Sequence, residues 1–96
     1  MTSKQRAYLR SLANTREPLL QVGKGGVTEG LISQLDQLLE HHELVKIRIL
    51  KTADLEARAL CSALAEETHA EPIQAIGNKL VLYRESQEHK EIFLPF

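Results

Sequence analysis

The spacing of apolar residues along the chain predicts a succession of amphipathic helices and short strands. Apolar positions three and four residues apart, with polar residues between them, favour helices over 3–15, 28–41 and 54–69. Apolar runs and alternating patterns favour strands over 19–22, 43–50, 72–76 and 79–84. The predicted order of elements is therefore α-β-α-β-α-β-β.

Local signals indicate where these elements begin and end. Ser3 and Thr28 are expected to cap the first and second helices, because a hydroxyl can accept a hydrogen bond from the first helical turn. Pro18 ends the first helix, since the residue before a proline is pushed out of the α region. Gly77-Asn78 lies between the last two strands and accepts the positive φ that a hairpin turn demands.

The order of elements also predicts the fold class. Two β-α-β crossovers should be right-handed and bring the first three strands parallel or nearly so, before the hairpin adds an antiparallel strand. In the third helix, Leu60, Ala63 and Leu64 are expected to face the core. We expect one compact α/β domain over 1–96, in which a four-stranded mixed sheet packs with the helices.

The C-terminal tail, residues 85–96, changes from polar to apolar at Ile92. We expect 92–96 to dock on its own domain, because an apolar terminus left in water would be a sticky patch. A partner protein is the alternative that would cover the same residues.

Composition adds expectations about location. With 43% hydrophobic and 26% charged residues, the chain is typical of a soluble globular protein. It lacks the long apolar run of a membrane span and the apolar core of a secretion signal. Cys61 is the only cysteine and shares a helix face with Ala57 and Leu64, so we expect a small buried hydrophobe in a reducing compartment. The expected location is cytoplasmic.

Charge is distributed unevenly along the chain, although the net charge is only −1. Residues 1–51 hold eight Lys and Arg against five acids, a net charge of +3. Residues 52–96 hold four bases and eight acids, a net charge of −4. This asymmetry allows a local positive surface on a nearly neutral molecule.

Candidate chemistry centres on the segment Leu-Leu-Gln-Val-Gly-Lys-Gly-Gly-Val-Thr at 19–28, where a strand runs through G-x-x-G into a helix. The backbone N–H groups of Gly23, Gly25 and Gly26 can converge on one anion, because glycine carries no Cβ. Lys24 would lie over that anion, and the helix capped by Thr28 would direct its first N–H groups to the same place. A simple tight turn would also account for the glycines. The spacing excludes a Walker A loop and the dinucleotide fingerprint, which leaves a clamp for a sugar-phosphate backbone.

With the loop placed on this topology, the chain resembles the YhbY family, the stand-alone bacterial form of the CRM (chloroplast RNA splicing and ribosome maturation) domain. The resemblance covers nearly the whole chain. It is carried by four motifs in order, namely VGKGGVT at 22–28, ELVKIR at 43–48, Ile76-Gly77 and LVLYR at 80–84.

The resemblance implies an RNA-binding module, similar in fold to the C-terminal domain of bacterial translation initiation factor three. It also implies association with precursors of the large ribosomal subunit. Carried onto this sequence, the RNA-contacting positions are the loop Gly23, Lys24, Gly25 and Gly26 and the basic strand positions Lys46 and Arg48.

Several cations could extend a track for an RNA backbone, namely Arg6, Arg10, Lys46, Arg48, Lys51 and Arg84. Arg6 and Arg10 are favoured on the first helix because they project together. Lys46 and Arg48 lie opposite the core-facing side of their strand, where they are either free for RNA or covered by the first helix. Tyr83 could stack on a base, but its register with Val81 favours a core position.

No catalytic or metal site can be assembled from the sequence. Neighbouring histidines such as His41-His42 point about 100° apart on a helix and cannot both chelate one ion, so we expect them to interact with carbonyls at the helix end. No nucleophile, base and orienting group occur together. The sequence therefore predicts a non-catalytic RNA-binding protein without cofactor or metal, with a monomer favoured.

Two alternatives stay open beside this prediction. One is a protein-interaction adapter in a ribonucleoprotein assembly, which would use the acidic third helix or the apolar C-terminal tail. The other is hydrolysis of small phosphate esters at the glycine segment.

Overall fold

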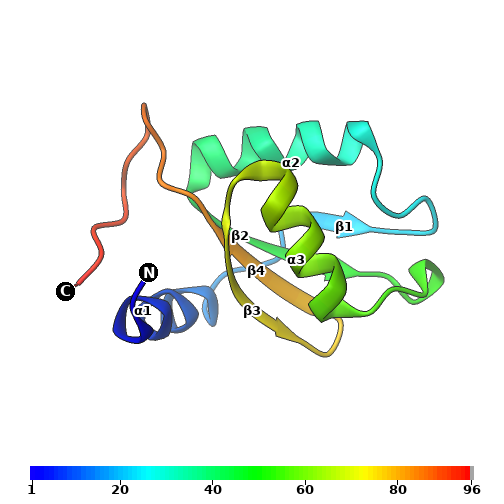
Figure 1. The fold of residues 1–96 in the computed structure, drawn as a ribbon, viewed down its shortest axis with the longest axis horizontal. Helices are drawn as coiled ribbons and strands as arrows, with labels where there is room; N and C mark the ends of the chain where they lie inside the picture. Colours follow the sequence, from blue (N-terminus) through cyan, green and yellow to red (C-terminus); the bar gives the residue numbers. More distant parts are fainter. Residues whose placement is uncertain (96) are drawn as a thin grey trace.

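A four-stranded mixed sheet lies at the centre of the structure, a computed structural model that describes residues 1–95 of the chain (Figure 1). The strands, in the spatial order β1-β2-β4-β3, are β1 (Leu20–Val22), β2 (Leu44–Ile49), β4 (Lys79–Tyr83) and β3 (Glu71–Ile76). β1 and β2 are parallel, and β4 is antiparallel to both of its neighbours. The predicted mixed sheet is confirmed: β1, β2 and β3 run one way, and β4 is inserted between two of them.

Helices cover both faces of the sheet (Figure 1). α2 (Glu29–His42) and α3 (Ala57–Thr68) pack on one face, and α1 (Ser3–Ala13) packs on the other. Alternation along β2 explains how this strand serves two layers, because Ile47 enters the core beneath α2 and α3 while Leu44 enters the core beneath α1. Leu80–Tyr83 of β4 is buried at every position, since both faces of this inner strand are covered.

The N-terminal ends of α1 and α3 differ from the predicted ones. Thr2, and not Ser3, caps α1, because the Thr2 hydroxyl accepts the Gln5 N–H at 3.1 Å and the Gln5 side chain accepts the Thr2 N–H at 3.0 Å. α3 begins at Ala57 and not near Asp54, which adopts a left-handed conformation with φ 49° after the short 3₁₀ helix η1 (Lys51–Ala53). Within residues 1–95, none of the helices is long and apolar enough to span a bilayer.

The inner face of α3 also differs in one residue from the prediction. Leu60 and Leu64 are buried as expected, but Ala63 is exposed. Cys61 is buried, as its register with Ala57 and Leu64 predicted, and it donates a weak hydrogen bond to the Gln74 carbonyl at 3.7 Å. The shorter helix therefore presents a face centred on 57, 60, 61 and 64 to the sheet.

Glu43 connects the C-terminal tail to the body of the domain. It has a φ of 63° between α2 and β2, and its side chain is fully buried. One carboxylate oxygen accepts the N–H groups of Glu91 and Ile92 at 2.7 and 2.8 Å, and the other accepts that of Ser86 at 2.8 Å. The tail thereby runs back toward α1 (Figure 1), where Ile92 is buried and Leu94 is partly buried, but Phe93 is 72% exposed, so the predicted docking is wrong for this residue. Phe96, the last residue of the predicted docking segment, lies outside the described residues.

Candidate nucleic-acid interface

The glycine loop, residues 23–28, connects the end of β1 to the start of α2. Gly26 has a positive φ of 64°, and its N–H donates to the Gly23 carbonyl at 3.0 Å, which closes a tight turn. This amide is therefore occupied by the protein itself. The Gly26 N–H is therefore not free to join those of Gly23 and Gly25 on one anion, and the predicted convergence of all three is wrong for Gly26.

Other N–H groups of the glycine loop remain open. Lys24 and Gly25 are exposed, and their N–H groups donate to no protein acceptor in the described part of the chain. Thr28 caps α2 as predicted, because its hydroxyl accepts an N–H of the first turn at 3.1 Å. The N–H groups of Glu29 and Gly30, at the start of α2, find no acceptor among residues 1–95. Open amides at a glycine turn and at a helix N-terminus are suited to an anion.

Four exposed cations surround this end of the sheet, and we call them the basic end: Lys24, Arg48, Lys51 and Lys79. β1 and β2 are parallel with Val22 opposite Ile49, so Lys24 and Lys51 both follow the same edge of the sheet. Arg48 lies directly opposite Lys79 in the β2–β4 ladder and opposite Gln21 in the β1–β2 ladder. Residues opposite each other share a sheet face, so these side chains form one exposed row that α1 leaves uncovered.

The four cations of the basic end have no ion-pair partner among residues 1–95. The three ion pairs found within residues 1–95 join Arg6 to Glu71, Arg84 to Asp36 and Lys90 to Glu85, and none involves the basic end. Acidic side chains gather in a groove of about 630 Å³ on the outer side of α2, which Glu29, Asp36 and Glu67 line together with Val27 and Thr28 of the glycine loop. The positive surface that the charge asymmetry allowed is therefore formed locally, by residues from three strands and their loops.

The remaining predicted RNA contacts are not brought to the glycine loop. α1 lies at the other end of the molecule from that loop (Figure 1). Arg6 is half-buried against β3, where it pairs with Glu71 at 3.5 Å, and Arg10 lies in the last turn of α1. Lys46 is covered by α1, as one of the two expectations held, and its Nζ donates to the Ala13 carbonyl at 3.1 Å. Of the cations predicted to extend the RNA track, Arg48 and Lys51 lie at the same end of the sheet as the loop.

Other candidate residues have structural roles. Arg84 donates to the Asp36 carboxylate and to a carbonyl at the end of α3, so it ties α2 to α3. Tyr83 is buried under α1, as its register predicted. Burial raises the pKa of the Cys61 thiol, which disfavours the nucleophilic thiolate. His41 Nδ1 lies 2.9 Å from a carbonyl one turn earlier in α2.

Sequence reasoning missed Lys79 as a member of the basic end. Lys79 is a solitary charged residue at the start of a short strand, and nothing local marks it. Its importance follows from the strand order, which places β4 beside β2 and so brings Lys79 opposite Arg48. Glu43 was likewise noticed only within a motif, because its burial depends on tail residues far along the chain that donate to it.

Comparison with known proteins agrees with this fold. The solution structure of the hypothetical protein SAV1595 from Staphylococcus aureus superposes with a TM-score of 0.79 and 43% sequence identity, covering 99% of both chains. The probable RNA-binding protein YqeI of Bacillus subtilis is 41% identical over 95 residues, covering 99% of both chains. An RNA-binding protein of Haemophilus influenzae is 40% identical over 91 residues, covering 94% of this chain and 91% of its own.

A protein-family model matches most of the chain. The model that describes the CRS1 / YhbY (CRM) domain matches residues 1–84, which include all of the helices and strands described above. Together with relatives of 40% identity or more along nearly the whole chain, this match confirms the resemblance that the sequence motifs indicated. The chain therefore belongs to the CRS1/YhbY (CRM) domain family.

Proposed function

We propose that this protein is a non-catalytic RNA-binding protein that holds the RNA backbone at the glycine loop and the basic end. One observation carries the proposal: the open N–H groups of Lys24 and Gly25 lie at the same edge of the sheet as four exposed cations without ion-pair partners among residues 1–95. Amides bind phosphate oxygens directionally, and cations add attraction that does not depend on sequence. Relatives named as RNA-binding proteins support this reading.

The direct test is RNA affinity after a charge reversal in the glycine loop. Lys24→Glu should weaken binding of a fluorescent single-stranded RNA by about tenfold or more, because a charge-assisted contact is lost and a repulsive charge is added. Lys4→Glu is the matched control, since it makes the same change at an exposed residue of α1. Equal affinities of Lys24→Glu and Lys4→Glu would remove the loop from the mechanism.

Salt dependence tests whether phosphates dominate the binding. Each phosphate contact on a single strand contributes a log-log slope of roughly −0.7, so four cations predict a slope of about −3. Lys24→Glu should make the slope less steep by about 0.7 or more. A slope near zero in the wild-type protein would contradict an interface built on the basic end.

We further propose that the RNA is a precursor of the large ribosomal subunit, whose assembly the protein assists. Membership of the CRS1/YhbY family supports this choice, and a partner of this kind makes the cytoplasm the expected location. The protein should co-sediment with precursor large subunits, and Lys24→Glu should shift it to the unbound fractions. Wild-type protein that binds free RNA but stays out of those particles would refute the assembly role alone.

A further inference from the structure

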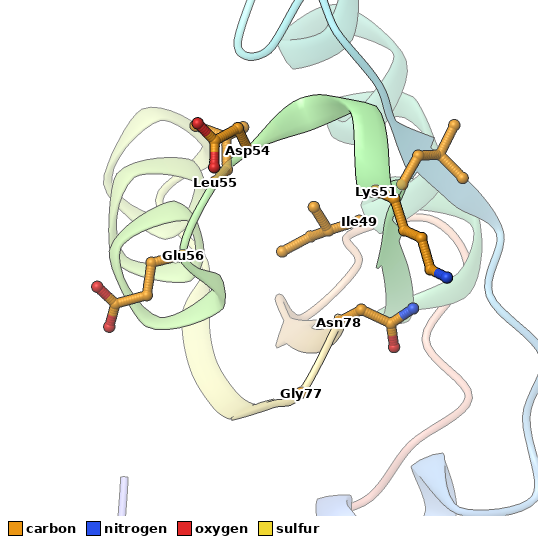
Figure 2. A pocket seen from close by; sticks show the side chains of 8 residues that line it. Ile49, Lys51, Asp54, Leu55, Glu56, Gly77 and Asn78 are labelled. Carbon is orange, nitrogen blue, oxygen red and sulfur yellow. The ribbon is translucent and has the colours of Figure 1, made fainter.

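A hollow of about 480 Å³ lies beside the glycine loop, between η1, the start of α3 and the β3–β4 turn (Figure 2). Its floor is the side chain of Ile49, which is almost completely buried, and Leu55 forms an apolar wall that is 40% exposed. Lys51 and Asn78 lie together on one side of this floor, and Asp54 and Leu55 lie on the opposite side (Figure 2). The hollow has the size of a small-molecule site.

Two side chains that line the hollow lie next to the glycine loop. Leu50 and Leu55, which line the hollow, are also the nearest side chains to Gly23 and Gly26. A Cβ built on Gly23 would lie 3.6 Å from Leu50, and one built on Gly26 would lie 3.9 Å from Leu55. A phosphate on the open loop amides and a group in the hollow would therefore be neighbours, separated by one layer of side chains.

The backbone around the hollow is fixed before any ligand arrives. The Ile49 N–H donates to the Asn78 carbonyl at 2.7 Å, which ties the hairpin turn to β2. The Leu50 N–H donates to the Val22 carbonyl at 2.9 Å, which ties the start of η1 to β1. A site of this kind binds without first ordering this part of its backbone, which lowers the cost of binding.

The chemistry of the lining matches a nucleobase. An apolar floor and wall suit the faces of a flat ring, and the rim supplies hydrogen-bonding groups for its edge: the Lys51 ammonium donates, the Asn78 amide donates and accepts, and the Asp54 carboxylate accepts. A base inside a duplex is stacked and paired, so only an unpaired base can enter.

We propose that this hollow receives an unpaired base of the RNA strand whose phosphate is held by the glycine loop. The inference rests on the proposed function and adds to it: the glycine loop and the basic end hold the backbone, while the hollow selects a flexible, single-stranded segment. Lys51 serves both parts, since it belongs to the basic end and to the rim of the hollow.

The first test compares ligands that share a phosphate but differ in the base. Isotope-labelled full-length protein is titrated with uridine 5′-monophosphate, adenosine 5′-monophosphate and ribose 5-phosphate while its backbone amide signals are recorded. All three should shift the signals of Lys24 and Gly25, and the nucleotides alone should shift those of Leu55 and Asn78. Shifts of Leu55 and Asn78 that are equal with ribose 5-phosphate, or absent with both nucleotides, would overturn the proposal.

The second test removes the apolar wall. Leu55→Ala should weaken binding of a short single-stranded RNA by about fivefold, the lower end of the loss seen when a stacking surface is removed, because this wall is aliphatic. Binding of the same strand made with abasic nucleotides should be unchanged. Leu19→Ala is the matched control, since Leu19 is exposed to a similar degree, 43%, and does not line the hollow.

The outcomes separate this inference from the proposed function. If Lys24→Glu weakens binding of both the intact and the abasic strand while Leu55→Ala weakens binding of neither, backbone binding at the glycine loop is supported and the base site is refuted. If the wild-type protein binds neither strand, both proposals fail together. Thermal unfolding of each variant checks that the fold is retained before its affinity is interpreted.

Discussion

Glu43→Gln tests whether one buried carboxylate holds the C-terminal tail on the domain. In the wild-type protein, three backbone N–H groups donate to its two oxygens at 2.7–2.8 Å. The amide of glutamine has nearly the same shape but keeps one acceptor oxygen. At least one of the three N–H groups would then face the NH₂ of the amide, a donor against a donor.

The expected loss of stability follows from these bonds. One buried N–H left without an acceptor costs about 1–3 kcal/mol, and bonds that change from a charged to a neutral acceptor lose roughly 1 kcal/mol each. We expect a loss of about 3 kcal/mol from a total of about 5–14 kcal/mol for a domain of this size. The melting temperature should therefore fall by about 12–24 °C.

Thermal unfolding followed by circular dichroism measures this change, and amide hydrogen exchange shows where it arises. Exchange should accelerate at Ser86 and Ile92, whose N–H groups lose their acceptor. Glu67→Gln is the control, because it removes the same charge from an exposed position of α3. A fall of less than about 4 °C for Glu43→Gln would mean that the carboxylate contributes under about 1 kcal/mol, and the reasoning would be wrong.

The same carboxylate predicts a dependence on pH. Burial raises the pKa of Glu43, but the hydrogen bonds from the N–H groups of Ser86, Glu91 and Ile92 outweigh burial, so the net pKa lies below its ordinary value. A lowered pKa in the folded state contributes stability above the pKa of the unfolded chain, about 4.3, and that stability is lost as the pH falls through the folded value. The difference in melting temperature between the wild-type protein and Glu43→Gln should narrow over this acidic range. A difference that stays constant from pH 7 to about pH 2 would contradict this assignment.

Four further substitutions test the structural roles of residues in and near the proposed interface. Thr28→Ala should lower the free energy of unfolding by about 1 kcal/mol, measured by urea denaturation, because the cap of α2 is lost; an unchanged midpoint would contradict a stabilising cap. Gly26→Ala should lower the free energy of unfolding by about 1–2 kcal/mol, because Gly26 has a φ of 64°, which alanine adopts only with strain. Gly25→Ala, whose new Cβ would meet open space, should leave it unchanged. Equal stabilities of the two variants would contradict a requirement for glycine at position 26. Lys46→Met should destabilise the domain by about 1 kcal/mol, since its bond to the Ala13 carbonyl is lost, while RNA affinity stays unchanged; a loss of affinity without loss of stability would place Lys46 in the interface.

The sequence alone determined the local elements and their order. Apolar spacing predicted the three helices and four strands, because burial of one face gives a helix an apolar period of about 3.6 residues and a strand a period of about 2, whatever the element packs against. It also indicated which side of β2 faces the larger core, since Val45, Ile47 and Ile49 alternate with polar residues. The roles of Thr28 and Gly77 could also be predicted, because a helix cap and a hairpin turn each require particular residue types at fixed positions.

Only the tertiary structure decided which distant residues meet. Insertion of β4 beside β2 brought Lys79 opposite Arg48, and the covering of Lys46 by α1 removed that lysine from the exposed surface. The same long-range packing buried Glu43 beneath the tail and formed the hollow beside the glycine loop. Periodicity reports how a residue is buried within its own element, but strand neighbours and helix positions depend on contacts between segments far apart in the chain, which no local pattern records.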